Sequence, residues 1–376
     1  MPQWVSVITE LLAPGRAEQR KRYIPPLDGA LLANSRLQEC AVLPGRDLLA
    51  PLDALPNADG SVLVSTGDQV VRCGPGDLTT REVVADFEGP AGPLGCTATG
   101  DLLVCVAGVG VVRVDESGRV EPVVTEVDGR PLLCPTGVTV ALDGTIYVTE
   151  GSTDHPPADW VWDLMEDNAS GRLLAVDPGT GKTTVLADGL PFPNGISLGP
   201  DQESVYFTLS WDHSIRRRWV AGARAGQVET VRSNMAGYPA QIHATADGNF
   251  WVALFAMRTQ LVEFVLGEDE YRQEMMRTID PDYWIRPALR SLNSGLEPLQ
   301  GGGIKKLGET KPWAPPRSYG FVMKMDADGE PICSLQSPAN GDRHGVWSAR
   351  EADGRVYIAC TGADAVLIAE EGLFAR

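Results

Sequence analysis

The stretch IHATADGNFWVAL, residues 242–254, places Asp247-Gly248 between two runs of apolar residues. Asp-Gly in this setting is typical of a β-hairpin, because glycine accepts the positive φ that tight turns need. Five further stretches have the same form or a relic of it: ALPNADGSVLVST (54–66), GCTATGDLLVCVA (95–107), GVTVALDGTIYVT (137–149), GISLGPDQESVYFTL (195–209) and VWSAREADGRVYIAC (346–360). The sequence therefore predicts six hairpins.

The spacing of these hairpins indicates the fold class. They recur at intervals of about 40 to 58 residues, apart from one gap of about 106, and propeller blades repeat at similar lengths. We predict an all-β, six-bladed β-propeller whose blades start near Leu52, Leu94, Pro135, Pro193, Pro239 and Gly345. In a propeller the functional residues are expected in the central channel, where the inner strands begin.

The rest of the chain is organised around this ring. We expect an N-terminal helix and lead-in over residues 1–34 and a single propeller over residues 35–376. The segment SRLQECAV, 35–42, alternates like a strand and has no local partner, so it is expected to close the last blade. Two insertions interrupt the repeat, at 151–170 and, in blade 5, at about 267–318. The second begins as a helix, and its aromatic residues favour a lid: Tyr283, Trp284, Trp313 and Tyr319.

The composition narrows the classes of partner. With 32 Lys+Arg against 50 Asp+Glu, the formal net charge is -18, which disfavours nucleic acid and anionic membranes as partners. No apolar run is long enough for a membrane span. The seven cysteines are scattered without CxxC or zinc-ligand spacing, so a reducing, cytoplasmic location is expected. The oligomeric state is not indicated.

Three stretches resemble the strictosidine synthase-like family: GRLLAVDPGTGKTTVLADGLPFPNGISLGPDQESVYFTLSWDHSIRRRWV (171–220), GYPAQIHATADGNFWVAL (237–254) and DGRVYIACTGADAVLI (353–368). The resemblance runs from about Leu52 to Ile368. It implies a six-bladed propeller related to gluconolactonases, senescence marker protein and paraoxonases. Those relatives include lactonases, esterases, phosphotriesterases and a condensation enzyme, so the resemblance leaves the reaction open.

The resemblance also bears on a metal. The hydrolytic relatives hold a catalytic Ca²⁺ with a Glu, two Asn and an Asp. Matched residue by residue, these positions carry Leu52, Thr136, Asn194 and Ala240 in this chain. Leu and Ala side chains cannot coordinate an ion that prefers carboxylate and carbonyl oxygens. We therefore expect no metal cofactor; if Ca²⁺ is bound, the ligands expected are Asn194, Asp53 and Gln241.

The catalytic glutamate of strictosidine synthase is not inherited either, because its position falls at Trp347. Histidines are the alternative, since imidazole exchanges protons near neutral pH. His344 immediately precedes the inner strand of blade 6, and His155 has Glu150 and Asp154 nearby as candidate carboxylate partners. We predict His344, His155 and Glu150 as catalytic residues, although a solvated loop explains His155 equally well. His243, within an inner strand, is expected to be a hydrogen-bonded core residue.

Other residues near the channel mouth are candidates for holding a substrate. The amide of Asn194 could polarise a carbonyl or hold an oxyanion without a metal. Aromatic side chains there would make an apolar cavity. The predicted substrate-binding residues are Asn194, Gln241, Trp347, His213, Thr136, Trp211 and Phe255.

Three functions follow from these observations. The first is a metal-independent enzyme of specialised metabolism, with lyase, cyclase or condensation chemistry on a hydrophobic small molecule. The second is a calcium-dependent lactonase or esterase, a hydrolase with a rebuilt metal site. The third is a non-catalytic propeller that binds a ligand, and a channel plugged by side chains would favour it.

Overall fold

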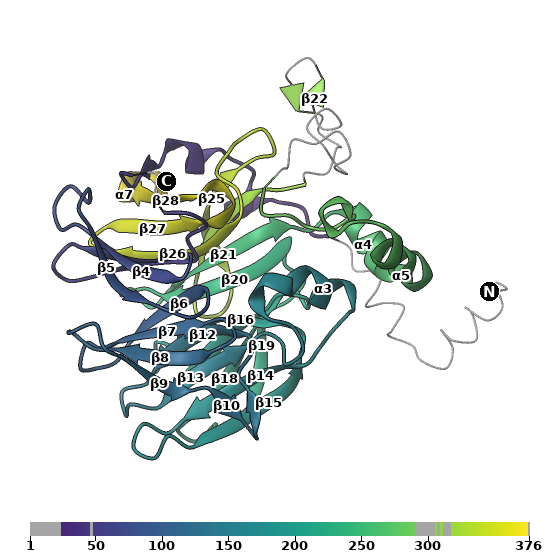
Figure 1. Cartoon of the computed structure of the whole chain (residues 1–376). Coiled ribbons are helices and arrows are strands. Elements are labelled where there is room, and N and C mark those ends of the chain that lie inside the picture. Colours follow the sequence, from purple (N-terminus) through teal and green to yellow (C-terminus); the bar gives the residue numbers. More distant parts are fainter. Residues whose placement is uncertain (1–23, 46–47, 291–304, 307–308, 311–316, 375–376) are drawn as a thin grey trace.

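A computed structural model describes residues 24–45, 48–290, 305–306, 309–310 and 317–374. In these residues six four-stranded antiparallel sheets form the blades of a propeller (Figure 1). Blade 1 contains β2 (Asp53–Pro56), β3 (Val62–Thr66), β4 (Gln69–Cys73) and β5 (Arg81–Asp86). Blade 2 contains β6 (Ala91–Cys96), β7 (Leu102–Val106), β8 (Gly110–Val114) and β9 (Val120–Val124). Blade 3 contains β12 (Pro135–Val140), β13 (Ile146–Glu150), β14 (Gly171–Val176) and β15 (Thr183–Leu190).

The second half of the ring repeats this order. Blade 4 contains β16 (Pro193–Leu198), β17 (Ser204–Leu209), β18 (Ser214–Trp219) and β19 (Val228–Arg232). Blade 5 contains β20 (Gly237–Ala244), β21 (Phe250–Met257), β24 (Gly320–Met325) and β25 (Pro331–Ser337). Blade 6 contains β26 (Val346–Ala352), β27 (Arg355–Cys360), β28 (Ala365–Glu370) and β1 (Ala41–Val42). The predicted all-β, six-bladed propeller is confirmed.

The six predicted hairpins are the first two strands of the six blades. Gly60, between β2 and β3, and Gly248, between β20 and β21, both have φ of +80°. A side chain would be strained in that conformation, which explains glycine after Asp in these turns. Each inner strand (β2, β6, β12, β16, β20 and β26) contacts the inner strands of the two neighbouring blades, so the ring is closed.

The N-terminal part of the propeller closes the last blade, but with less strand than the sequence predicts. Within the predicted strand 35–42, Ala41 and Val42 pair with β28, opposite Ile368 and Leu367. Arg36–Glu39 instead forms a 3-10 helix, with Leu37 buried against blades 5 and 6. The alternation in 35–42 therefore comes from a short helix that buries one residue, followed by a two-residue strand.

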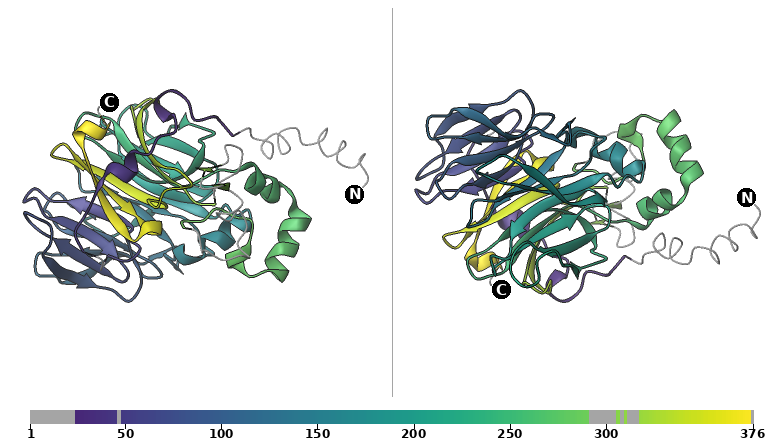
Figure 2. Two further views of the ribbon diagram at one scale, coloured as in Figure 1. Left: turned by 90° about the horizontal axis from the view of Figure 1, so that it is seen from above. Right: turned by 90° about the horizontal axis from the view of Figure 1, so that it is seen from below.

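Both insertions lie on the same side of the molecule, where α3, α4 and α5 project from the strands (Figures 1 and 2). The first contains a 3-10 turn, Pro157–Asp159, and α3 (Trp160–Met165). The second begins with α4 (Gln260–Gly267), earlier than the sequence predicts, and continues with α5 (Asp269–Thr278) and a 3-10 turn, Pro281–Tyr283. Trp162 and Trp284 join the two insertions, with ring centroids 4.6 Å apart. Trp313 lies outside the described residues.

A few short elements complete the chain. They are the pairs β10 (Glu126–Val127) with β11 (Arg130–Pro131) and β22 (Lys305–Lys306) with β23 (Glu309–Thr310), 3-10 turns at Gly29–Leu31 and Thr361–Ala363, and the terminal helix α7 (Glu371–Phe374). None of the helices in the described ranges is long and apolar enough to cross a membrane.

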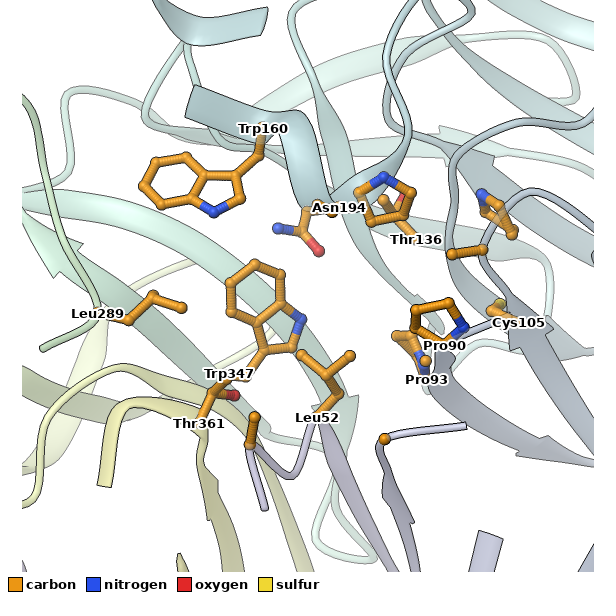
Figure 3. A pocket seen from close by; sticks show the side chains of 17 residues that line it. Leu52, Pro90, Pro93, Cys105, Thr136, Trp160, Asn194, Leu289, Trp347 and Thr361 are labelled. Carbon is orange, nitrogen blue, oxygen red and sulfur yellow. The ribbon is translucent and has the colours of Figure 1, made fainter. Parts of the chain in front are cut away.

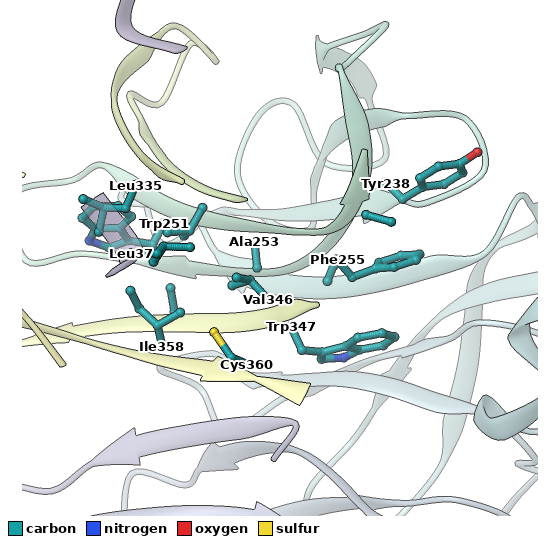
Figure 4. Close-up of a cluster of buried hydrophobic side chains, with 14 of the residues drawn as sticks. Leu37, Tyr238, Trp251, Ala253, Phe255, Leu335, Val346, Trp347, Ile358 and Cys360 are labelled. Atoms are coloured by element: carbon teal, nitrogen blue, oxygen red, sulfur yellow. The ribbon is translucent and has the colours of Figure 1, made fainter. Parts of the chain in front are cut away.

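The largest hydrophobic cluster lies between blades 5 and 6 and extends to the channel mouth (Figure 4). Trp251 and Val346 are fully buried in it, Phe255 and Trp347 belong to it, and Trp160 and Trp284 of the two insertions are part of the same cluster. Burial of large apolar side chains between neighbouring sheets is the main stabilisation available to a propeller. The same cluster therefore holds the blades together and positions the aromatic wall of the site.

Candidate functional site

A cavity of about 260 Å³ lies at the channel end where the inner strands begin (Figure 3). The inner strands of blades 2, 3, 4 and 6 contribute to its lining, together with residues that flank β2 and β3 of blade 1 and residues of both insertions. It is lined by Ala50, Leu52, Gly67, Pro90, Gly92, Pro93, Cys105, Ala107, Pro135, Thr136, Pro157, Ala158, Trp160, Asn194, Leu289, Trp347 and Thr361. The ends of the inner strands and the two insertions therefore form a pocket together.

The lining is apolar and carries no charge. None of the described residues that line the cavity is an acid, a base or a histidine. Burial raises the pKa of the Cys105 thiol far above its usual range, so this group stays protonated and unreactive. Acid–base chemistry therefore has no titrating side chain on these walls near neutral pH.

The hydroxyl groups in the lining are already hydrogen-bonded to the backbone. Thr136 Oγ1 donates to the carbonyl oxygen of Pro193 at 2.7 Å, and Thr361 Oγ1 donates to that of Pro51 at 2.7 Å. These bonds tie the starts of neighbouring blades together. Neither hydroxyl has a proton left for a ligand.

Asn194 is the remaining polar side chain of the lining and lies between the two tryptophans (Figure 3). Its Oδ1 accepts from Gln241 Nε2 at 3.0 Å, and its Nδ2 donates to Ser210 Oγ at 3.2 Å. Gln241 Nε2 also donates to the carbonyl oxygen of Thr136 at 2.8 Å. An amide nitrogen carries two hydrogens. The bond to Ser210 uses one of them, and the other is available for a ligand.

Two tryptophans form opposite walls of the cavity. Trp347, from β26, stacks on Phe255 with centroids 5.1 Å apart, and Trp160, from α3, meets Phe255 edge-on at 5.3 Å. Behind them Trp211 lies 6.2 Å from Trp160 and donates its indole N–H to Asp163 at 2.6 Å. Phe255 and Trp211, predicted to bind substrate, thus support the wall without lining the cavity.

A second polar layer lies further along the inner strands. Asp53, in β2, is fully buried and accepts from Arg350 Nε at 3.0 Å and Arg350 Nη2 at 2.7 Å. Despite the opposing effect of burial, Arg350 and the surrounding hydrogen bonds hold the pKa of Asp53 below its usual range. His243 lies 3.9 Å from this carboxylate, and burial together with the Arg350 charge lowers the His243 pKa to about 3. Near neutral pH the three groups therefore sum to zero charge.

His344 does not face the cavity, contrary to the sequence prediction. Its Nδ1 is hydrogen-bonded to Ser318 Oγ at 2.9 Å and its Nε2 to the carbonyl oxygen of Pro338 at 2.9 Å. The Nε2 hydrogen must therefore point to the carbonyl, and Nδ1 accepts from the serine. Burial lowers the pKa of His344, which favours this neutral form. The ring holds two loops together, and both of its nitrogens are engaged.

Glu150 is also placed away from the lining. It is fully buried and accepts a hydrogen bond at 2.7 Å from Nε of Arg172, its partner across β13 and β14. Burial raises the pKa of Glu150 in spite of that partner. Glu150 does not pair with His155 as the sequence predicts, because its side chain points towards the neighbouring strand.

His155 lies at the rim, two residues before Pro157 of the lining. Its Nε2 is 2.7 Å from Glu166 Oε2, so the histidine has a carboxylate partner, though a different one from that predicted. The ring of His213 meets the ring of Tyr238 edge-on, with centroids 4.6 Å apart, and its Nε2 lies 3.7 Å from Oε1 of Glu263 in α4. Of the predicted catalytic residues, the structure thus leaves one near the cavity.

Several lining residues were not predicted. Trp160, Pro157 and Ala158 belong to the first insertion, and Leu289 to the second. The sequence signal was present, since two tryptophans occur in an insertion too long for a hairpin loop. Among the predicted substrate-binding residues, Asn194, Trp347 and Thr136 line the cavity, and Gln241 supports Asn194 from below.

The residues at the expected calcium position do not fit that ion. Leu52 and Ala240 offer no side-chain oxygen, and the Thr136 hydroxyl and Asn194 Oδ1 already have partners. Both oxygens of Asp53 are bonded to Arg350. In the described part of the chain no group of three or more His, Cys, Asp or Glu side chains could hold a metal.

Comparison with known proteins identifies relatives. A family model described as strictosidine synthase matches residues 136–223. Protein strictosidine synthase-like 13 of Arabidopsis thaliana is 34% identical over 180 residues, which cover 48% of this chain and 44% of that protein. Adipocyte plasma membrane-associated protein of Salmo salar is 31% identical over 355 residues, covering 89% of this chain and 79% of that protein. The match to the Arabidopsis relative thus spans less than half of its length.

Solved structures show the same architecture. The calcium-binding protein regucalcin from Agrobacterium tumefaciens str. C58 superposes with a TM-score of 0.54 at 13% identity, over 88% of this chain and 92% of that chain. At this identity the likeness concerns the fold, and ligand preferences do not transfer with it.

Proposed function

The chain belongs to the strictosidine synthase-like family, and from this premise and the lining of its pocket we propose that it binds an uncharged, largely apolar small molecule at the channel mouth. The observation that carries the proposal is the pair of facing tryptophans, Trp160 and Trp347, in a cavity whose described lining has no charged side chain.

The absence of charged side chains from the described lining disfavours charged ligands at this site. A charged ligand would leave water without finding an ion-pair partner on the walls, and an unpaired buried charge is costly. An apolar ligand instead gains from contact with Trp160, Trp347 and Leu52. The pocket therefore favours neutral molecules with a flat or ring-shaped apolar part.

Asn194 adds a single polar requirement. Its Nδ2 hydrogen that does not go to Ser210 is proposed to donate to a carbonyl or hydroxyl oxygen of the ligand. One such hydrogen bond contributes on the order of 0.5–1.5 kcal/mol, or about 2- to 10-fold in affinity. Gln241 keeps the amide in this orientation by donating to its oxygen.

A matched set of probes tests the proposal by isothermal titration calorimetry. 2-Acetylnaphthalene is neutral and carries an acceptor, naphthalene lacks the acceptor, and 2-naphthoate is an anion of similar shape. We expect the ketone to bind at least about 10-fold tighter than the anion and about 2- to 10-fold tighter than naphthalene. Equal or tighter binding of 2-naphthoate would contradict the proposal.

A second candidate function is a metal-independent enzyme that uses the same pocket. The pairing of His155 with Glu166 at the rim favours it, because a carboxylate orients an imidazole for proton transfer. Lyase, cyclase, condensation and ester-cleaving reactions all remain within this candidate. The calcium-dependent hydrolase is not carried forward, since the ligand positions do not fit the ion.

Turnover of 2-naphthyl acetate in the presence of a chelator tests this second candidate. If His155 is the general base, His155→Gln should lower turnover by about 100-fold or more and leave the affinity for 2-acetylnaphthalene unchanged. A wild-type rate equal to that of buffer would remove ester cleavage from this candidate, and equal rates for the two proteins would remove His155 as its general base.

We also propose a cytoplasmic location. All seven cysteines are free, and six of them are buried, which suits a reducing compartment. Localisation of a tagged full-length chain by microscopy tests this, and a secreted or luminal signal would contradict it.

A further inference from the structure

Asp53 joins three neighbouring blades. Its Oδ2 accepts from the backbone N–H of Leu94 in β6 at 3.0 Å, and its Oδ1 accepts from that of Ala54 at 2.9 Å. Arg350 of β26 donates to both oxygens and also to the carbonyl oxygen of Leu94 at 2.6 Å. Blades 1, 2 and 6 therefore meet at a single carboxylate and a single guanidinium.

This arrangement performs the tasks of a bound cation. An ion in a propeller channel neutralises buried carboxylates and ties oxygen atoms from several blades to one centre. Arg350 neutralises Asp53 and bonds to oxygens from two other blades, and its planar fork matches the carboxylate in two parallel bonds. His243, neutral because burial lowers its pKa to about 3, adds no charge to the pair.

We propose that the Arg350 guanidinium is a built-in replacement for a channel metal ion, which makes this propeller independent of Ca²⁺ and gives Asp53 a structural role. The proposal does not depend on what the mouth pocket binds. It concerns the layer of Asp53, Arg350 and His243, and Asp53 and Arg350 do not line the pocket.

The first test is thermal unfolding of the full chain in millimolar CaCl₂ and in a chelator. The wild-type midpoint should be the same within about 1 °C, because a protein gains stability only from an ion that its folded state binds. A clear rise of the unfolding midpoint in the presence of Ca²⁺ that is abolished by Asp53→Asn would overturn the proposal, since it would make Asp53 a metal ligand.

The second test is a double-substitution cycle on the pair. Arg350→Met and Asp53→Asn should each lower the midpoint by about 5 °C or more, because each leaves a buried group without its partner. The combined variant should be more stable than the sum of the two losses predicts. Additive losses would overturn the proposal, because the two side chains would then stabilise the fold independently.

Two further variants keep the cycle interpretable. Arg350→Lys retains the charge but not the two parallel bonds, so its unfolding midpoint should lie between those of the wild type and Arg350→Met. It remains measurable if Arg350→Met does not fold. Arg355→Met removes an arginine on the adjacent strand whose pairing with Glu370 is exposed, and it should change the midpoint by about 1 °C or less. A loss for Arg355→Met as large as that for Arg350→Met would contradict the special role of Arg350.

Discussion

Replacing Arg172 by Met is expected to lower the free energy of unfolding by about 3–5 kcal/mol at pH 7. The substitution leaves the fully buried carboxylate of Glu150, in β13, without the guanidinium of Arg172 that bonds to it from the neighbouring strand β14. The backbone N–H of Leu133, 3.3 Å from Oε1, is the hydrogen-bond donor that remains for it. A backbone amide does not cancel a unit charge, so this single change should be among the most damaging in the chain.

The loss should depend on pH in a defined direction. The pKa of Glu150 in the folded protein is already raised by burial, so between the unfolded and the folded pKa values the folded state binds more protons than the unfolded state. Stability therefore falls as the pH rises through and above the unfolded pKa of about 4.3, and it is recovered on acidification. Removing Arg172 widens this interval, because it removes the group that opposes the shift.

Urea unfolding at several pH values between 5 and 8 measures this effect. The Arg172→Met loss should grow with pH, and Glu150→Gln combined with it should restore part of the stability at pH 7. Arg119→Met, which removes an exposed arginine paired with Glu121, should cost less than about 0.5 kcal/mol. A pH-independent loss for Arg172→Met would show that the effect comes from packing, and the charge argument would be wrong.

Filling the pocket is expected to weaken the binding of a neutral probe. Ala107 lines the cavity at the turn between β7 and β8, and Ala107→Phe would place a ring in the space that the ligand needs. Overfilling a well-packed site costs on the order of 1–3 kcal/mol, so the affinity for 2-acetylnaphthalene should fall by about 10- to 100-fold or more. Calorimetric titration measures the change.

Ala246→Phe is the matched control. It makes the same substitution in the exposed turn between β20 and β21, and it should leave the affinity unchanged. Both variants should unfold at temperatures close to that of the wild type, because neither residue belongs to the buried core. Equal affinity of Ala107→Phe and the wild type would place the probe elsewhere on the molecule.

The ring could be predicted from the sequence because its signal is local. Each Asp-Gly turn lies a few residues from the strands that it joins, and the same backbone requirement recurs in most blades. That Leu52 and Ala240 cannot coordinate an ion could also be recognised from the sequence, since the absence of a side-chain oxygen is a property of the residue itself. Asn194, Thr136 and Trp347 reached the pocket because their positions follow from where the inner strands begin.

The remainder of the site depends on contacts between distant residues. Arg350 bonds to Asp53 from the other end of the chain, and nothing in the sequence near either residue indicates the pair. His344 precedes an inner strand as predicted, but Gly345, with φ of +66°, turns the chain there, and the imidazole meets Ser318 instead. Trp160 comes from an insertion that is not part of the blade repeat, so the repeat could not predict where its side chain lies.

The central claim is that a neutral, apolar molecule occupies the space between Trp160 and Trp347. A crystal structure of the full chain grown with 2-acetylnaphthalene tests it most directly. We expect the naphthalene ring between the two indoles and the ketone oxygen within hydrogen-bonding distance of Asn194 Nδ2. A probe bound elsewhere, with the space between the two tryptophans filled only by water, would contradict the account.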